Sequence, residues 1–345
     1  MGINDTLTML KAIEQIPNEP NFFVDMFTKD LGVVEDETAI WDYMKGGQHM
    51  APFVVPGTGG VELPRDGFVT RQIEFPVIAP ERIVDDQMIK TRAFGEVLYG
   101  GMTPAQRALK IQARDLKDLK ASINRRKGWM VRQVLLNGKL DILRYVKGGR
   151  EAETTMVADF GFTNNYVPAT AWGQVGSNIH SDLNAIMDLV EEGGGRVDQI
   201  VMDGDSADAM LADDKFTKLL DIRNVHIGEI EQRYMGGGMR YMGMTGDGVR
   251  FYSYRGKFID DDGLKKDVLP RGTVIAGSND TLKLAYGPIT LVDKTGADGK
   301  FVTYMAKEVP QRIASEESGS IVNRVTSRPV VVPFNVDGWA VAKVL

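Results

Sequence analysis

Three aspartates in the middle of the chain have the spacing of a candidate metal site. Asp203 ends the run RVDQIVMD, which is typical of a strand, Asp205 follows it, and Asp208 lies close behind them. Carboxylates at the end of such a strand often bind divalent cations in α/β enzymes. The same residues fit a simpler role, because Asp203 to Ser206 can turn the chain and cap the next helix. We favour the cap and keep a carboxylate-metal-dependent enzyme at Asp203 and Asp205 as an alternative.

Other residues of catalytic type are sparse. The sequence has no Cys, which removes thiol nucleophiles, disulfides and Cys-ligated zinc, and its three His (His49, His180 and His226) lie far apart. The glycine triplets at 193–195 and 236–238 lack the following Gly-Lys-Ser/Thr of a phosphate-binding loop. We therefore predict no catalytic residue, no cofactor site, no metal ligand and no enzyme.

The densest basic run is Arg125-Arg126-Lys127. From Thr103 to Leu140 the chain carries ten Lys or Arg against two Asp, a net charge of +8, whereas the whole chain carries −6 and the remainder therefore −14. A basic segment in an acidic chain should pair with acidic surface, its own or a neighbour's. We interpret the run as a solvated face or an inter-subunit pair, and a nucleic-acid-binding protein that uses this basic helix is the competing hypothesis.

These basic residues lie on a predicted helix of 34 residues over 104–137. Thr103 and Gln106 form a capping box at its start, and Asn137-Gly138 is a natural stop. Gly128 is an internal breaker that favours a bend. The predicted apolar stripe consists of Leu109, Leu116, Ile123 and Met130, widened by Ala113, Leu119 and Val134.

The segments before this helix are predicted to be short or extended. Residues 4–16 suit an amphipathic helix with Leu7, Leu10 and Ile13 on one side. An aromatic cluster follows, which is either a core anchor or an arm that docks on a neighbouring subunit: Phe22, Phe23, Met26 and Phe27. Residues 51–99 are so rich in Pro and Gly that we expect no helix there and a long two-stranded excursion. Because a lone hairpin is marginal in water, such an arm points to assembly.

After the long helix, the sequence predicts strands and two further helices. A hairpin is expected around Lys147-Gly148-Gly149, and a helix over 178–193 with its apolar face inward. The strand 196–203 and a third helix, DSADAMLADDKFTKLLDI, complete a compact α/β module. The remaining predicted strands are 225–232, 239–260, 268–277, KLAYGPITLVD, KFVTYMAKEV and the tail from Arg324, with a hairpin turn at 260–263.

Composition is that of a folded soluble protein, with 43% hydrophobic and 26% charged residues. The N-terminus lacks the pattern of a signal peptide, and no window approaches 18 uninterrupted apolar residues. We therefore expect no membrane span.

Six segments, in this order, carry a family resemblance: FFVDMF, PVIAPERIVDDQM, RALKIQARDLKDLKASINRRKGWMVRQVLLNGKLDI, IVMDGDSADAML, VLPRGTVIAG and RPVVVPFNVDGWAVAKVL. Together they resemble the lambda-type major capsid protein E family of tailed bacteriophages, over most of the chain. Arg328 departs from the family pattern, which tends to place a small residue before this proline. The link from Gly287 to Pro310 also differs, so the C-terminal register is the least certain part of the match.

The resemblance implies an α+β, Hong Kong 97-type phage capsid fold with a long spine helix. It divides the chain into an N-terminal arm (1–50), an extended loop reaching over a neighbour (51–100), a peripheral domain with the spine helix (101–177), an axial domain (178–302) and C-terminal strands returning to the peripheral domain (303–345).

The function implied by the resemblance is a structural one. Copies would form hexamers and pentamers of an icosahedral shell around double-stranded DNA, with a scaffold, a portal and a decoration protein as further partners. The DNA would be enclosed cargo, and no membrane would be involved. The protein would be made in the host bacterial cytoplasm and reside in the virion capsid. No Lys–Asn pair that cross-links some shells of this fold is matched.

Overall fold

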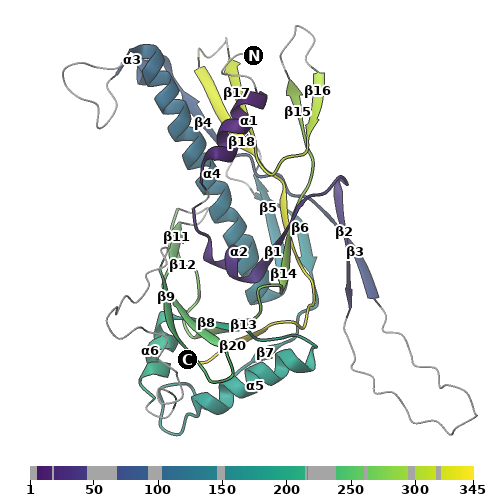
Figure 1. Ribbon diagram of the computed structural model, residues 1–345, viewed down its shortest axis with the longest axis vertical. Helices are drawn as coiled ribbons and strands as arrows, with labels where there is room; N and C mark the ends of the chain where they lie inside the picture. Colours follow the sequence, from purple (N-terminus) through teal and green to yellow (C-terminus); the bar gives the residue numbers. More distant parts are fainter. Residues whose placement is uncertain are drawn as a thin grey trace, which may run out of the picture.

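The computed structural model describes residues 6–17, 19–44, 68–91, 103–145, 152–213, 216, 238–259, 263–293, 300–315 and 320–345. Its longest element, α4 (Pro104–Asn137), runs down one flank of the molecule (Figure 1). A sheet with helices α5 (Ile179–Glu192) and α6 (Gly204–Leu211) lies beyond the C-terminal end of α4. On the other flank, β2 (Thr38–Met44) and β3 (Phe68–Glu74) extend as a two-stranded ribbon.

Both ends of α4 are where the sequence predicts them. The Thr103 hydroxyl accepts the N–H of Gln106 at 3.3 Å, and the Gln106 side chain accepts the N–H of Thr103 at 3.0 Å, which completes the capping box. At the other end, Gly138 adopts a left-handed φ of 60° and donates its N–H to the carbonyl of Val134 at 2.8 Å. Local capping chemistry therefore determines the length of this helix.

The prediction of the apolar stripe of α4 is confirmed from Leu116 onward, where its residues are buried, and is wrong before it. Leu109 is 47% exposed and Ala113 is also exposed, while Gln112 and Asp115 are buried in their place. The reason is a polar contact with the neighbouring sheet, because Asn323 donates to the Asp115 carboxylate at 2.9 Å. The first turns of α4 thus face their partner sheet with polar side chains, which a periodicity of apolar residues cannot reveal.

That partner is the antiparallel sheet β17–β18–β4, formed by Val309–Ser315, Ser320–Thr326 and Glu81–Val84. Its inner face contributes Val325 to a small core with Leu116, Leu119 and Ile123 of α4. Helix α1 (Thr6–Gln15) packs beside α4 and over β17. Met9 and Ile13 of α1 are buried, whereas Leu7, predicted to share the inner side, is 46% exposed.

A central core joins the N-terminal segment to α4. Its elements are α2 (Phe22–Phe27) and the sheet β1–β14–β19, formed by Thr28–Val33, Leu282–Tyr286 and Pro329–Pro333. Phe23 and Phe27 are 2% and 0% exposed in this core, so the core-anchor interpretation is confirmed for these two. Trp339 is also buried there and donates its indole N–H to the carbonyl of Leu135 at 2.9 Å.

The six-stranded sheet has two apolar faces. Its strands run in the order β7 (Asn165–Tyr166), β20 (Ala340–Lys343), β13 (Thr273–Gly277), β8 (Gln199–Asp203), β10 (Arg250–Tyr254) and β9 (Met239–Met244). Ile275 points into the central core, whereas its neighbours Val274 and Ala276 point into a second core with α5. This alternation is that of a strand buried on both sides.

The last strand departs from the predicted domain pattern. Residues 303–345 are expected to return to the region of the long helix, and β17, β18 and β19 do lie there. However, β20 pairs antiparallel with β13 and parallel with β7, so it lies inside the sheet of the 178–302 segment. Buried side chains at 340–342 on both faces of the strand explain this position, because they need cover on both sides.

The remaining strands form hairpins. They are β5–β6 (Lys139–Tyr145 and Ala152–Asp159), β11–β12 (Lys257–Ile259 and Lys265–Asp267) and β15–β16 (Ile289–Asp293 and Lys300–Tyr304). Both strands predicted around 147–149 and both flanking the turn at 260–263 are present. The prediction of one continuous third helix over 205–222 is wrong, because α6 ends at Leu211 with Ala212 as its C-cap. Most of the residues from 214 to 222 and the predicted strand 225–232 lie outside the described residues.

A short helix occurs where the sequence predicts extended chain. Residues Asp86–Lys90 form α3, with an ion pair of 2.5 Å between the first and last of them. Arg107 of α4 donates to the carbonyl of Ile89 at 2.7 Å and so satisfies one of the free carbonyls of this turn. A contact with a residue outside this segment therefore stabilises α3. The prolines on which the prediction of extended chain was based all precede Glu81, so none of them lies within α3.

Candidate functional site

The aspartate at the end of β8 caps a helix. The Asp203 carboxylate accepts the backbone N–H of Asp205 at 3.1 Å and also the hydroxyl of Ser206. Asp203 is only 5% exposed, and both of its oxygens are used in these contacts. The favoured capping interpretation is therefore confirmed.

The other two aspartates pair with different cations. Asp205 contacts Arg271 at 2.8 Å, and Asp208 contacts Arg255 at 2.7 Å. Arg255 also donates to the carbonyl of Gly204 at 3.2 Å, so it bridges the first turn of α6 to the end of β10. Across the part of the chain that the structure describes, no three His, Asp or Glu gather closely enough to hold a metal ion.

The three residues of the basic run of α4 lie in three different environments. Arg125 is exposed and lies 3.7 Å from Glu19, while the guanidinium of Arg126 stacks 5.2 Å from the centre of the Trp129 ring. Lys127 is buried and forms an ion pair of 2.8 Å with Glu308, whose side chain is only 10% exposed. The prediction of a solvated face or an inter-subunit pair is therefore wrong for Lys127, which holds α4 to the connection before β17.

Lys127 belongs to a charged cluster around one tyrosine. Its ammonium lies 4.9 Å from the centre of the Tyr286 ring, and Lys307 lies 5.4 Å from the same ring. Lys307 in turn pairs with Asp30 of β1. Burial, followed by the nearby Asp30 carboxylate, raises the pKa of Tyr286 far above its ordinary value. The cluster thus ties β1, β14 and α4 together through charges that are paired inside the chain.

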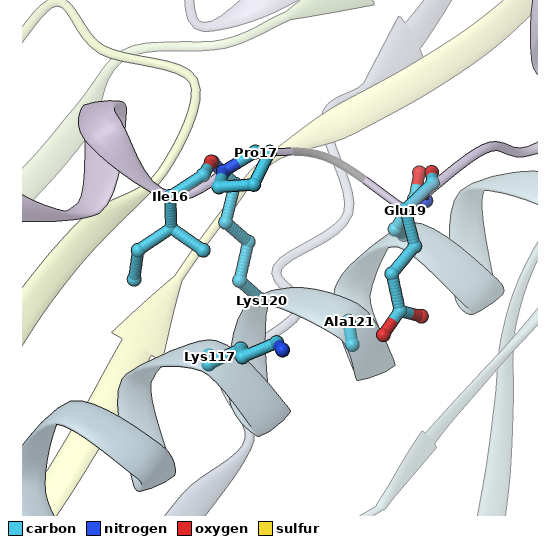
Figure 2. Close-up of a pocket in the computed structure, with 7 residues that line it drawn as sticks. Ile16, Pro17, Glu19, Lys117, Lys120 and Ala121 are labelled. Carbon is cyan, nitrogen blue, oxygen red and sulfur yellow. Dashed lines mark hydrogen bonds between the residues drawn. The ribbon is translucent and has the colours of Figure 1, made fainter.

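A stripe of three residues on α4 contacts the N-terminal segment, and the sequence-based predictions do not include it. Lys120 donates to the carbonyls of Ile13 and Ile16 at 2.9 and 2.5 Å. Figure 2 shows Lys120 reaching from α4 to this end of α1, beside Lys117 and Glu19. The two carbonyls belong to the C-terminal end of α1, where a cation is favourable.

The stripe continues by single helical steps to Asn124 and Gly128. Asn124 donates to the carbonyl of Glu19 at 2.6 Å and accepts, through its own carbonyl, the side-chain N–H of Asn21 at 2.5 Å. At Gly128 a Cβ would stand 2.6 Å from the Asn21 amide, so glycine provides close approach here. The i, i+4, i+8 spacing of a cation, an amide and a glycine is the sequence signal that could have revealed this contact.

Burial alters the acidity of the first member of the stripe. Lys120 is 8% exposed, and desolvation lowers the pKa of its ammonium, although Glu308 and Glu14 act in the opposite direction. A neutral amine still has two N–H groups, which is the number that the two carbonyl contacts require.

Arg328, the departure noted in the tail, has a defined role in the fold. It donates to the carbonyl of Pro288 at 2.8 Å, and a second nitrogen lies 3.4 Å from the carbonyl of Phe75. The arginine therefore links the start of the β15–β16 hairpin to the base of the β2–β3 ribbon.

Two hairpins have features that suit contact with a further partner. On β15–β16, Val292 and Phe301 are directly paired and are 44% and 79% exposed. The ribbon β2–β3 pairs only with itself along seven residue pairs, from Thr38–Glu74 to Met44–Phe68. Two-stranded sheets of this kind are marginally stable without a further partner.

Two small pockets lie along α4. One lies between residues 16–19 and α4 and the other between α4 and β18, and each has a cavity volume of about 10 Å³. That is room for about one water molecule, whereas small-molecule sites span roughly 300–1,000 Å³. Among the described helices, none combines the length and the apolar character needed to cross a membrane.

Comparison with known proteins gives a family match over almost the whole chain. The family model for phage major capsid protein E matches residues 5–344. No curated protein sequence matches this chain.

Solved structures with a similar fold come from several phage-related sources. A protein described as a capsid protein of a prophage in E. coli CFT073 is similar with a TM-score of 0.69 and 16% identity, over 99% of both chains. A phage-related protein from Bordetella bronchiseptica RB50 has a TM-score of 0.52 and 9% identity, over 97% of this chain and 95% of that one. The mature capsid of bacteriophage PhiM1 contains a chain with a TM-score of 0.51 and 13% identity, over 94% of this chain and 87% of that one.

Proposed function

The chain belongs to the phage major capsid protein E family, and from this premise we propose how its copies build a shell. The protein is a structural component of a phage capsid shell, and its fold is the Hong Kong 97-type capsid fold. The proposal concerns the contacts between copies and the further partners of the shell.

The observation that carries the proposal is the ribbon β2–β3. It leaves the central core at Ile73 and Phe75, which are 5% and 2% exposed, and extends away from the body of the molecule (Figure 1). A two-stranded ribbon with a buried root gains stability when another copy covers it. We therefore assign the ribbon to the loop that reaches over a neighbour, which would begin with β2, before the predicted start at residue 51, and end before β4, which pairs with β18 of its own chain.

The proposed domains are centred on α4 and on the six-stranded sheet, and two strands cross their bounds: β14 of the 178–302 segment packs in the central core, and β7 of the 101–177 segment joins the six-stranded sheet. Residues 178–302 would form the axial domain around α5 and the six-stranded sheet, and 101–177 the peripheral domain around α4. Residues 303–345 would return to the peripheral domain through β17–β19, with β20 crossing into the axial sheet. Residues 1–50 would form the N-terminal arm, and its contacts with Lys120 and Asn124 favour an arm held against its own α4.

The further partners are those of a shell. Hexamers and pentamers of this chain would enclose double-stranded DNA as cargo, assembled in the host bacterial cytoplasm with a scaffold, a portal and a decoration protein. A structural rather than catalytic role is supported by the aspartates at the end of β8, because each already has a capping or ion-pair partner within the chain.

A shortened ribbon tests the proposal. Met44 and Phe68 are directly paired, so a two-residue Asn-Gly turn can replace residues 45–67 and keep the register of the hairpin. We expect the full chain to form shells or capsomers in electron microscopy and sedimentation, and the shortened chain to keep its circular dichroism but form neither.

The matched control shortens the hairpin β5–β6 in the same way. Tyr145 and Ala152 are directly paired, so Asn-Gly can replace residues 146–151. This control should still assemble. A full chain that stays a compact monomer, or a shortened ribbon that assembles as well as the full chain, would contradict the proposal.

A further inference from the structure

Three cations form a row on the solvent side of α4. Lys110, Arg114 and Lys117 follow one another at i, i+4 and i+7, which places them within about 60° of one another around the helix axis. All three are exposed, and they lie opposite the buried positions of the same turns, which are Gln112, Asp115, Leu116 and Leu119. We call these three residues the cationic row.

The cationic row is not neutralised within the described chain. Lys110 and Lys117 have no ion-pair partner among the described residues, and Arg114 lies at the outer limit, 4.0 Å, from Asp118. Asp118 is already paired with Arg82 at 2.7 Å. Like charges at i, i+4 spacing weaken a helix, so the row opposes the stability of an isolated copy.

An acidic counterpart lies on the other side of the molecule. Glu35, Asp36 and Glu37 are consecutive exposed residues between β1 and β2, and no described residue pairs with them. Their position is fixed on one side, because Val34 donates its N–H to the carbonyl of Tyr286 at 2.8 Å. We call these three residues the acidic turn.

The two groups belong to elements on different flanks of one copy. Helix α4 occupies one flank, and the start of β2 lies on the opposite flank, with α1, β17 and β18 between them (Figure 1). A contact between two different surfaces of identical subunits is heterologous, and such contacts repeat around a closed ring. Opposite charges on the two flanks are the arrangement that a ring of copies can use.

We propose that the cationic row of one copy binds the acidic turn of the next copy in the shell, an inference that rests on the proposed function. Three cations meet three carboxylates, so each group gains the partners that its own chain does not supply. Because the charges are exposed before contact, they steer the approach of the copies and are screened by salt.

Charge reversal tests this contact. The row variant carries Lys110→Glu, Arg114→Glu and Lys117→Glu, and the turn variant carries Glu35→Lys, Asp36→Lys and Glu37→Lys. Each should assemble at least about tenfold more slowly than the wild type at low salt, measured by light scattering and sedimentation. A milder variant with Gln at 110, 114 and 117 should assemble at a rate between those of the row variant and the wild type. Circular dichroism checks that every variant folds.

The combined variant gives the sharpest result. With both groups reversed, each copy again offers opposite charges to its neighbour, so assembly should recover. Mixed with the wild type, however, it should form separate shells, because like charges meet at every mixed contact. A matched control reverses three exposed lysines elsewhere, Lys265→Glu, Lys300→Glu and Lys343→Glu, and should assemble like the wild type.

Four results would overturn the inference. In the first, both the row variant and the turn variant assemble like the wild type; in the second, the combined variant folds but does not recover assembly. In the third, the lysine control loses as much assembly as the row variant; in the fourth, combined and wild-type copies mix freely in one shell. A row variant that assembles normally but loses salt-dependent binding of duplex DNA would assign the row to phosphates instead. If the wild type itself forms no assembly, the proposed function fails and takes this inference with it.

Discussion

The side-chain amide of Asn21 lies 2.6 Å from the place that a Cβ on residue 128 would occupy, so the N-terminal segment and α4 meet at Gly128 without a gap. Asn21 also donates to the carbonyl of Asn124, one turn earlier on the helix. The glycine is therefore a contact surface, and the bend that the sequence suggests is not needed to explain it.

Replacing this glycine should destabilise the protein despite better helix propensity. Alanine favours a helix by about 1 kcal/mol over glycine, but Gly128→Ala pushes into the Asn21 amide, and overpacking typically costs about 1–3 kcal/mol. We expect a net loss in urea unfolding of unassembled protein. In an Asn21→Ala background the same change should become stabilising, and an equal loss in both backgrounds would refute the steric explanation.

The buried pair of Lys127 and Glu308 should be costly to break from one side. Lys127→Met leaves the Glu308 carboxylate buried and unpaired, which typically costs about 3–5 kcal/mol. The double variant Lys127→Met with Glu308→Leu should recover most of this loss in chemical denaturation. Arg125→Gln is the control from the same basic run, because its exposed pair with Glu19 is worth only about 0–1 kcal/mol.

Lys120 should give the folded protein a stability gain at alkaline pH. Desolvation lowers the pKa of Lys120 in the folded state below its ordinary value of 10.5. Between the two values the unfolded chain binds more protons than the folded one, so stability rises with pH in that window. The wild type should therefore gain relative to Lys120→Met as the pH approaches 10.5. A difference that stays flat over this pH range would count against a buried ammonium.

The end of β8 should respond as a helix cap and not as a metal site. Asp203→Ala should cost about 0.5–2 kcal/mol in thermal or urea unfolding, whereas Asp203→Asn should cost little, because Asn is an equally good N-cap. Both variants should still form shells, and a chelator should change neither stability nor assembly. Loss of assembly in Asp203→Asn, restored by added Mg²⁺, would favour the carboxylate-metal alternative.

Features set by neighbouring residues were predictable from the sequence. The capping box at Thr103, the stop at Gly138 and the cap at Asp203 all depend on residues at most four positions apart. The hairpins β5–β6 and β11–β12 follow from alternation around a short turn. In each case the contact that determines the local structure lies within one short segment of the sequence.

Features that depend on a distant partner were not predictable. Leu109 is exposed because the sheet beside it offers Asn323 to Asp115 instead of an apolar surface. Lys127 is buried because Glu308, far along the chain, reaches it. The position of β20 depends on β7 and β13, and the residue types at 340–343 do not indicate which strands they pair with. The cluster around Phe23, one interpretation of which was a core anchor, did indicate a long-range contact in advance.

The place of β20 between β7 and β13 also determines when the six-stranded sheet can be completed during synthesis. The ribosome makes both neighbours well before residue 340, so a gap stays open in the sheet until translation has passed Lys343. A chain that stops before residue 340 consequently lacks the strand that joins β7 to β13. The strand order thus makes completion of the six-stranded sheet depend on synthesis through Lys343.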